Sequence, residues 1–362
     1  MAGKFKRRNF LLGLTAAGCA TKPPAPAENG TGADKQGERA QDKPEPESGE
    51  ILDAGHRPKN EAMARRPLGK TGETVSALGL GGYHLGIPSE REATAIMHRA
   101  IDQGMNFFDN CWDYHGGESE RRMGRALQGG KREKVFLMTK IDARTKQAAH
   151  LQIDECLRRL QTDRIDLMQI HEVAREKDGP WVFGEDGAIS ALQEAQQAGK
   201  IRFTGFTGHK SPLIHLSMLD AARLHGFAFD AVQMPLNALD PHFKSFEKLV
   251  LPRLVAEGIA VLGMKSLASG LALKSGLQPQ QCLRYSLSLP TSVVITGCDS
   301  LPILDQALQV ARSFVPMQDD EKLALLERTQ PFGKQGELEM FKTTDRYDAT
   351  LRNKHWLTTG NL

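Results

Sequence analysis

The fold is decided by three short runs, Asn106-Phe107-Phe108-Asp109, Val135-Phe136-Leu137-Met138-Thr139-Lys140 and Ile165-Asp166-Leu167-Met168-Gln169-Ile170-His171. Each is apolar, has the length of a β-strand and closes on a polar side chain, Asp109, Lys140 or His171. These polar residues follow one another at intervals of 31 residues. An interval of this size accommodates one strand, one helix and two loops. We therefore expect parallel βα units whose closing polar residues meet at one edge of the sheet.

The same alternation continues along the chain. Between the β-rich runs lie longer segments, such as 90–103, 147–160, 188–198 and 246–257, whose apolar residues recur at the three- and four-residue intervals of amphipathic helices. Eight β-rich runs are present, and eight βα units close a (β/α)8 barrel, the TIM barrel of the α/β class. The expected strands are 77–80, 106–108, 135–139, 165–170, 201–206, 231–233, 259–263 and 292–295.

A doubly wound dinucleotide-binding sheet is the alternative that the alternation leaves open. Such a fold carries a G-x-G-x-x-G pattern after its first strand. Residues 79–84 are Gly-Leu-Gly-Gly-Tyr-His, so the third glycine is missing. The barrel is the better prediction.

The first 19 residues are organised like an export signal. Residues 4–8 are mostly basic and precede a short apolar run, residues 10–17. The pair Arg7-Arg8 resembles the twin-arginine signal, and the residues around Cys19 resemble a lipobox, in which the cysteine is acylated. We expect export by the twin-arginine translocase to the periplasm, with membrane attachment only through a lipid at Cys19.

The composition divides the remaining chain into three parts. Residues 20–62 are rich in Pro, Glu and Lys with almost no large apolar side chain, so we expect a disordered tether. Residues 63–325 are the expected barrel. Residues 326–362 contain four aromatic side chains, which a solvated tail does not need, so we expect this C-terminal extension to pack on the barrel. It would close the mouth of the barrel or cover an outer helix.

Charge and cysteine content exclude two classes of function. The chain has 47 Lys and Arg against 44 Asp and Glu, and four of the basic residues lie before residue 9, so the body has no net basic charge. Nucleic acid is therefore not an expected partner. No two of the five cysteines have a C-x-x-C spacing, and we expect no metal site.

The polar residues at the strand ends form a chemically coherent set. Tyr114 lies five residues after Asp109, in the loop above the same strand. A tyrosine hydroxyl can protonate a carbonyl oxygen during hydride reduction, and a nearby cation such as Lys140 is expected to lower its pKa. Asp109 can balance the charge of Lys140, and His171 can donate a hydrogen bond to the same oxygen. A lyase or isomerase that uses Lys140 as a Schiff base is the alternative chemistry.

These residues resemble the Asp-Tyr-Lys-His tetrad of the aldo-keto reductase superfamily. The resemblance extends over nearly the whole body, because it includes Arg66-Pro67-Leu68-Gly69-Lys70-Thr71-Gly72, the Gly-Gly-Glu-Ser-Glu that begins at Gly116, and residues 157–167. It implies an NAD(P)H-dependent reduction of a small-molecule aldehyde or ketone to an alcohol, with Asp109, Tyr114, Lys140 and His171 as the catalytic residues. An exported cofactor-binding sensor or partner subunit with negligible turnover is the alternative function.

The resemblance also implies a set of cofactor contacts at the strand ends. They are Gly81, Gly82, Tyr83, Asp109, Thr207, Gln233, Met264, Ser266, Leu267, Ser269, Gly297 and Ser300. Thr207 replaces the usual serine, and Met264 replaces an aromatic residue. Asp299 lies where enzymes that bind the 2′-phosphate of NADP place a basic residue, which favours NAD. The family as a whole favours NADP, and NADP(H) is expected slightly ahead of NAD(H). The sequence does not indicate which carbonyl compound is reduced.

Overall fold

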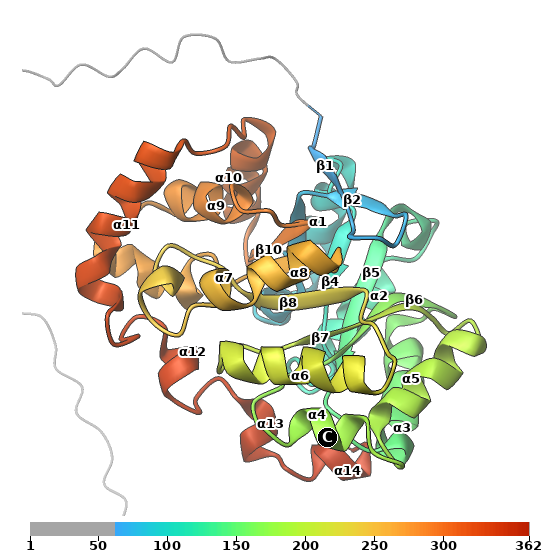
Figure 1. Cartoon of the computed structure of the whole chain (residues 1–362). Helices are drawn as coiled ribbons and strands as arrows, with labels where there is room; N and C mark the ends of the chain where they lie inside the picture. The colour runs from blue at the N-terminus through green and yellow to red at the C-terminus, as the bar shows by residue number, and fades with distance from the viewer. Residues whose placement is uncertain (1–61, 362) are drawn as a thin grey trace, which may run out of the picture. The chain divides into compact units, whose positions relative to one another are not determined.

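The computed structural model describes residues 62–361, and Figure 1 shows a central group of strands ringed by helices. The predicted export signal, residues 1–19, and the predicted tether up to residue 61 lie outside the described residues. Eight parallel strands form a closed barrel in the order β10-β3-β4-β5-β6-β7-β8-β9. They are β3 (Leu78–Gly81), β4 (Phe107–Asp109), β5 (Phe136–Ile141), β6 (Ile165–Ile170), β7 (Ile201–Thr207), β8 (Ala231–Pro235), β9 (Ala260–Met264) and β10 (Val293–Gly297).

The barrel confirms the predicted fold class, and each predicted strand overlaps one that is observed. The register aligns the carboxyl ends of the strands, since Gly297 pairs with Gly81, Gly81 with Asp109, and Thr207 with Gln233. The residues that the sequence placed at strand ends therefore share one end of the barrel. We refer to this end as the mouth.

A two-stranded hairpin that the sequence did not predict closes the opposite end. Its strands, β1 (Arg65–Pro67) and β2 (Thr74–Ser76), pair antiparallel before the barrel begins. Leu68 and Val75 are fully buried and pack with Phe107 and Phe136, which lie at the beginnings of their strands. The hairpin thus seals the barrel where the strands start.

The outer layer is built from the helices that follow the strands. One predicted helix, 246–257, is divided in two, because Pro252 has no N–H to donate within a continuous helix. The elements are η1 (Gly82–Gly86), α1 (Glu90–Asp102), α2 (Glu118–Ala126), η2 (Arg132–Lys134), α3 (Lys146–Leu160), α4 (Asp178–Val182), α5 (Ala188–Gln197), α6 (Pro212–Leu224), η3 (Asp240–His242), α7 (Phe246–Leu249), α8 (Leu251–Glu257), η4 (Ala268–Ser275), α9 (Pro279–Leu287) and α10 (Leu301–Arg312).

The chain then continues through α11 (Asp319–Gly333), α12 (Met340–Thr343), α13 (Ala349–Arg352) and α14 (Trp356–Thr359). Figure 1 shows this last part in dark orange to red, with α11 and α12 at the left and α13 and α14 at the bottom. From Glu339 onward it is bonded to loops that follow strands. The bonds join Arg144 to Leu357, Glu172 to Thr350, Arg175 to Thr350, His209 to Asp348, and Asn237 to Glu339. The end of the chain therefore covers the mouth.

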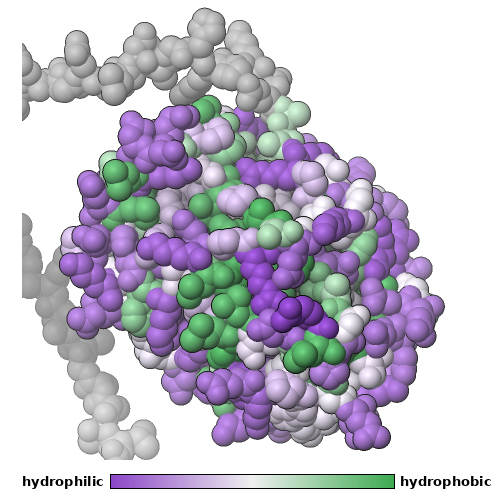
Figure 2. Space-filling model, in the orientation of Figure 1, coloured by the Kyte–Doolittle hydropathy of each residue, from purple (hydrophilic) through white to green (hydrophobic). Residues whose placement is uncertain are grey.

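The surface of the molecule carries both hydrophilic and hydrophobic residues. In Figure 2 hydrophilic residues predominate at the rim, and hydrophobic residues form separate patches nearer the centre. Exposed large apolar side chains include Leu213 and Leu224 on α6 and Val315 before α11. None of the helices within residues 62–361 is long and apolar enough to cross a membrane.

Candidate active site

A buried ion pair between Lys140 and Asp109 forms the centre of the site. Lys140 lies on β5, Asp109 ends β4, and at most 5% of either side chain is exposed. The Lys140 ammonium also donates to the carbonyl oxygen of Asn110 at 2.6 Å and to the hydroxyl oxygen of Tyr114 at 3.3 Å. All three contacts of the Lys140 amino group are with hydrogen-bond acceptors, so this group is engaged by its own surroundings and is not placed as a free nucleophile for a Schiff base.

Tyr114 is held over this ion pair by a tight turn that leads into α2. The turn is built on Gly116 and Gly117, which both have positive φ angles that glycine adopts readily. The Tyr114 ring meets the rings of Tyr83 and His171 edge-on, with centroids 5.4 Å and 5.9 Å away. Since the Tyr114 oxygen accepts from Lys140, its own proton is free to be donated elsewhere.

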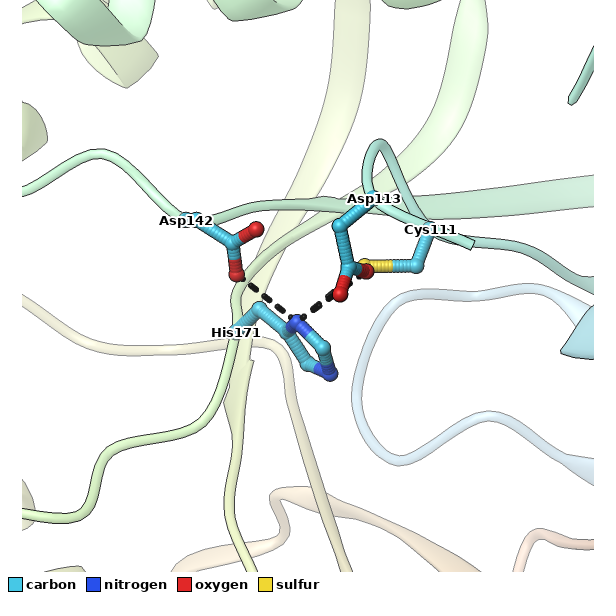
Figure 3. A group of neighbouring side chains, drawn as sticks. All are labelled: Cys111, Asp113, Asp142 and His171. Carbon is cyan, nitrogen blue, oxygen red and sulfur yellow. Dashed lines mark hydrogen bonds and ion pairs between the residues drawn. The ribbon is translucent and has the colours of Figure 1, made fainter. Parts of the chain in front are cut away.

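His171 follows β6 and is surrounded by acidic and thiol groups (Figure 3). Its Nδ1 lies 2.8 Å from Asp142 Oδ1, 3.2 Å from Cys111 Sγ and 3.8 Å from Asp113 Oδ1. Figure 3 shows Nδ1 turned toward these groups and Nε2 turned away from them. The ring is therefore anchored through Nδ1, and Nε2 is left for another partner.

Burial shifts the pKa of Tyr114 in the direction opposite to the one predicted from the sequence. Loss of solvent raises the pKa of Tyr114 well above its usual range, and the carboxylate of Asp109 raises it further. The sequence predicted instead that Lys140 lowers this pKa. The Lys140 ammonium contacts the Tyr114 hydroxyl, but burial and the Asp109 carboxylate outweigh it. Tyr114 is consequently a neutral hydroxyl near pH 7.

The groups around His171 titrate closer to neutrality. Burial lowers the pKa of His171, so its imidazole is uncharged near pH 7. Burial and the neighbouring Asp142 carboxylate raise the pKa of Asp113 to about 6. Burial raises the pKa of Asp142 to about 7. A proton is therefore readily shared within this group, and it can lie between Asp142 and His171.

The same four residues are the set within the described chain that could hold a metal ion. One ligand atom each from Cys111, Asp113, Asp142 and His171 lies within 4.8 Å of the others. However, burial raises the pKa of the Cys111 thiol well above its usual range, and the neighbouring carboxylates raise it further. A cysteine binds a metal ion as the thiolate, so metal binding here would have to displace the thiol proton of Cys111. Hydrogen bonding accounts for the contacts of His171, and we assign no metal here.

The cofactor residues predicted on β3, β7 and β8 lie around the mouth. Gly81 ends β3 and Gly82 begins η1, where a Cβ would come within 2.5 Å of the carbonyl oxygen of Asp109. Tyr83 is half exposed beside Tyr114. Thr207 is buried at the end of β7. The Gln233 side-chain amide donates to Asp109 at 3.3 Å.

The remaining predicted cofactor residues follow β9 and β10. Met264 ends β9 and is half-buried, Ser266 is buried, Leu267 is half-buried, and Ser269 is exposed with a φ of 59°. Gly297 ends β10, and Ser300 is the N-cap of α10 but makes no side-chain capping bond. The first N–H groups of α10 thus lack a side-chain acceptor from the cap, which suits a phosphate.

Two buried amide side chains test whether a nicotinamide group suits this site. Gln233 Oε1 and both amide atoms of Gln169 are buried without a hydrogen-bond partner among the described residues. A carboxamide carries both a donor and an acceptor, and it can satisfy such atoms. The residues present therefore fit a nicotinamide cofactor.

Asp113, Asp142 and Lys265 also belong to the mouth, and none of them was predicted from the sequence. Asp113 and Asp142 lie within 4 Å of His171 Nδ1. Lys265 immediately follows Met264, and its ammonium lies 5.3 Å from the ring of Phe341. Each lies within two residues of a predicted position, namely Tyr114, Lys140 or Met264. Their closeness in sequence to predicted site residues could have marked them as candidates. Loop residues have no periodic pattern, however, so the sequence does not show which way their side chains point.

Comparison with known proteins agrees with the geometry. Residues 77–310, well over half of the chain, match the aldo/keto reductase family. The chain belongs to the aldo/keto reductase family. This family comprises NAD(P)-dependent oxidoreductases, typically with NADP(H), and the chain is one of them.

The relatives are moderately similar in sequence. L-galactose dehydrogenase of Arabidopsis thaliana is 30% identical over 261 residues, which are 65% of this chain and 75% of the relative. An aldo-keto reductase of Schizosaccharomyces pombe named for NADP(+) is 32% identical over 159 residues, which are 39% of this chain and 45% of the relative. The holo form of an aldo-keto reductase from Bacillus halodurans has the same fold, with a TM-score of 0.62, 24% identity, and coverage of 74% of this chain and 96% of that one.

Proposed function

We propose that this oxidoreductase reduces an aldehyde or ketone to an alcohol with Tyr114 as the general acid. The observation that carries the proposal is the hydrogen bond from Lys140 Nζ to the Tyr114 hydroxyl, beside the Asp109 carboxylate and His171. This bond fixes the Tyr114 oxygen as an acceptor and points its proton away from Lys140. A bound nicotinamide supplies the hydride for the carbonyl carbon.

The residues of the site divide the remaining tasks. Tyr114 donates its proton to the carbonyl oxygen as negative charge develops there. Lys140 stabilises the resulting phenolate, and Asp109 holds the Lys140 ammonium in place. His171 Nε2 donates a second hydrogen bond to the same oxygen and orients the carbonyl. Gly81, Gly82, Thr207 and Gln233, together with Ser266, Leu267 and Ser269 after β9 and Gly297 and Ser300 at the end of β10, would hold the cofactor.

Removal of the Tyr114 hydroxyl tests this assignment. Tyr114→Phe should lower kcat for aldehyde reduction by at least about 100-fold, because general acid catalysis commonly contributes that much. The Kd for NADPH, measured by fluorescence titration, should change by less than about threefold. Activity within tenfold of the wild type would exclude Tyr114 as the acid. Cofactor binding by the wild type without reduction of any aldehyde, ketone or quinone would favour a binding protein instead.

We further propose NADP(H) as the preferred cofactor, slightly ahead of NAD(H). The family typically uses NADP(H), and one relative is named for NADP(+). Burial lowers the pKa of His84, and the carboxylate of Asp299 lies near enough to oppose that shift. Asp299 is the feature that opposes the preference for NADP(H). A carboxylate near a 2′-phosphate is repulsive, whereas it can accept a hydrogen bond from a free ribose hydroxyl.

Export of the folded protein to the periplasm is also part of the proposal. It rests on Arg7-Arg8 and Cys19, together with the need of a dinucleotide enzyme to acquire its cofactor in the cytoplasm. The mass of the mature protein from the membrane fraction should correspond to a chain that begins at an acylated Cys19. Replacing both arginines with lysine should leave the full-length chain in the cytoplasm, and unchanged export would contradict the route.

A further inference from the structure

A second lysine, Lys265, enters the mouth of the barrel from the loop after β9. It follows Met264 and has a φ of 55°, in the left-handed region that side-chain-bearing residues rarely adopt. His115 and Glu172 have similarly positive φ angles directly after Tyr114 and His171. Three loops of the mouth thus hold an unfavourable backbone conformation at the residue that follows a site position. Such strain persists where the surrounding structure fixes a side chain in a particular direction.

The Lys265 side chain extends between the barrel and the C-terminal extension. Its ammonium lies 5.3 Å from the centre of the Phe341 ring and 5.5 Å from that of Tyr347. Both distances are within the range of cation–π contact. The charges that act on it belong to Glu172, Asp348, Lys140 and Asp109. The ammonium therefore lies between the catalytic residues and the aromatic side chains that cover them.

Other inward-facing lysines have carboxylate partners, and Lys265 does not. Lys140 pairs with Asp109, Lys210 with Asp348, and Lys342 with Asp240 and Glu339. Within residues 62–361, no carboxylate oxygen comes within the 4.0 Å of an ion pair with Lys265.

The two acidic residues that act most strongly on Lys265, Glu172 and Asp348, are already engaged. Glu172 accepts hydrogen bonds from the backbone N–H groups of Ala349 and Thr350, at 3.2 Å and 2.8 Å. Asp348 bonds His209 and Lys210 at 2.9 Å and 2.6 Å. Lys265 is half-buried, and this burial lowers its pKa to about 8, so the ammonium has lost part of its solvent and has no counter-charge. An anion at this place would relieve both deficits.

We propose that Lys265 binds a carboxylate of the substrate while Tyr114 and His171 engage its carbonyl oxygen. This inference rests on the proposed reductase function and narrows its substrates to carbonyl compounds that also carry a carboxylate. Phe341 and Tyr347 supply apolar contact for the part of the substrate between the two polar groups. A phosphate of the cofactor would offer similar charged oxygens. The carboxylate is favoured because the ammonium lies against Phe341 and Tyr347 of the extension.

Matched pairs of aldehydes test the proposal. Steady-state rates would be measured at saturating NADPH with 4-formylbenzoate against 4-methylbenzaldehyde, and with 4-oxobutanoate against butanal. Lys265→Met keeps an unbranched side chain of nearly the same length at this positive-φ position but removes the charge. It should raise KM for at least one carboxylated aldehyde by about 30-fold, as expected for a lost charged hydrogen bond. KM for the neutral partner and the Kd for NADPH should change less than threefold.

Two control variants sharpen the comparison. Lys265→Arg retains the charge and should keep the preference for the carboxylated member of the pair. Lys274→Met removes an exposed positive charge from η4 and should behave as the wild type. Equal effects of Lys265→Met on charged and neutral aldehydes would overturn the proposal. A weakened Kd for NADPH with unchanged substrate discrimination would assign Lys265 to the cofactor phosphates instead.

A binding measurement separates this inference from the proposed function. If the wild type reduces neither aldehyde of any pair, the reductase proposal fails. Calorimetric titration with 4-formylbenzoate and 4-oxobutanoate then still reports the carboxylate site. At least tenfold weaker binding to Lys265→Met than to the wild type would support the site. Equal binding to the two proteins, or no binding to either, would overturn it.

Discussion

At the scale of single residues, the site depends on which atoms carry protons. Lys140 uses its three N–H groups on Asp109, Asn110 and Tyr114, and this leaves the Tyr114 proton available. His171 is different, because its Nδ1 faces Asp142 and its Nε2 faces away (Figure 3). Whether Nε2 can donate depends on the number of protons that Asp142 and His171 share.

Asp142 should make the reaction sensitive to pH near neutrality. When Asp142 and His171 together hold two protons, one proton is shared between His171 Nδ1 and Asp142 Oδ1, and the other is on Nε2. Nε2 can then donate a hydrogen bond. The pKa of Asp142 is about 7, so the pair loses a proton as the pH rises through that value. The remaining proton then stays on Nδ1, where it bonds the carboxylate, and Nε2 ceases to donate. We expect kcat for reduction to fall between pH 6 and pH 8.

Asp142→Asn provides the check on this pH dependence. The side-chain amide of this variant would donate to His171 Nδ1 at every pH, so kcat should be nearly flat between pH 6 and pH 8. An unchanged profile in this variant would show that another group is responsible. The groups that act on Asp142 are Arg144, Lys140 and Arg175, which lower its pKa, and Glu120, which raises it.

At the scale of elements, the strands were easier to predict than what lies between them. Each barrel strand is a short apolar run bounded by polar residues, and β6 was predicted with its bounds. The β1–β2 hairpin was missed because strands of three residues carry too little periodicity. The helix expected at 246–257 is divided because Pro252 has no N–H to donate. The spacing of apolar residues does not show this break, so the sequence pattern predicted one continuous helix.

Helix α12 is the element that ties the C-terminal extension to the barrel. Lys342 on α12 forms ion pairs of 2.7 Å with Asp240 and with Glu339, and it donates to the carbonyl oxygen of Phe243 at 2.8 Å. The three charged side chains are fully buried. Burial and the Asp240 carboxylate raise the pKa of Glu339 to about 7.

Lys342→Met should therefore destabilise the protein substantially. It leaves two buried carboxylates facing each other, and loss of one partner of a buried pair costs about 3 kcal/mol or more. The free energy of unfolding in urea measures the loss, and hydrogen exchange should show faster exchange in residues 339–359. Lys322→Met, which breaks an exposed pair with Asp319, should change stability by less than about 0.5 kcal/mol. Equal losses of unfolding free energy in the two variants would mean that the buried cluster stabilises the protein no more than a surface ion pair does.

At the scale of the whole molecule, the barrel gathers residues that are far apart in the chain. Site residues as far apart in the chain as Gly81 and Ser300 meet at one end, because parallel strands in a closed barrel all finish on the same side. The extension from Glu339 onward then covers that end. A cofactor that binds there contacts only the folded state, so binding must raise the stability of the whole barrel.

Cofactor preference can be read from this linkage. At about 100 times its Kd, a cofactor stabilises the folded state by about 2.7 kcal/mol, which corresponds to several degrees in Tm. At equal concentrations, NADPH should raise Tm more than NADH does. Asp299→Asn should enlarge the shift with NADPH because it removes a negative charge beside the 2′-phosphate. A consistently larger shift with NADH would reverse the proposed preference.

The sequence by itself determined the barrel and the position of Asp109, Tyr114, Lys140 and His171 at its mouth. This was possible because successive βα units place the ends of their strands side by side in the barrel, independently of the conformation of the loops. Only the tertiary structure decided that Asp113 and Asp142 face His171, that burial raises the pKa of Tyr114, and that Lys265 lies under the C-terminal extension. These features depend on loop conformation, burial and contacts between distant segments. None of them leaves a periodic trace in the sequence.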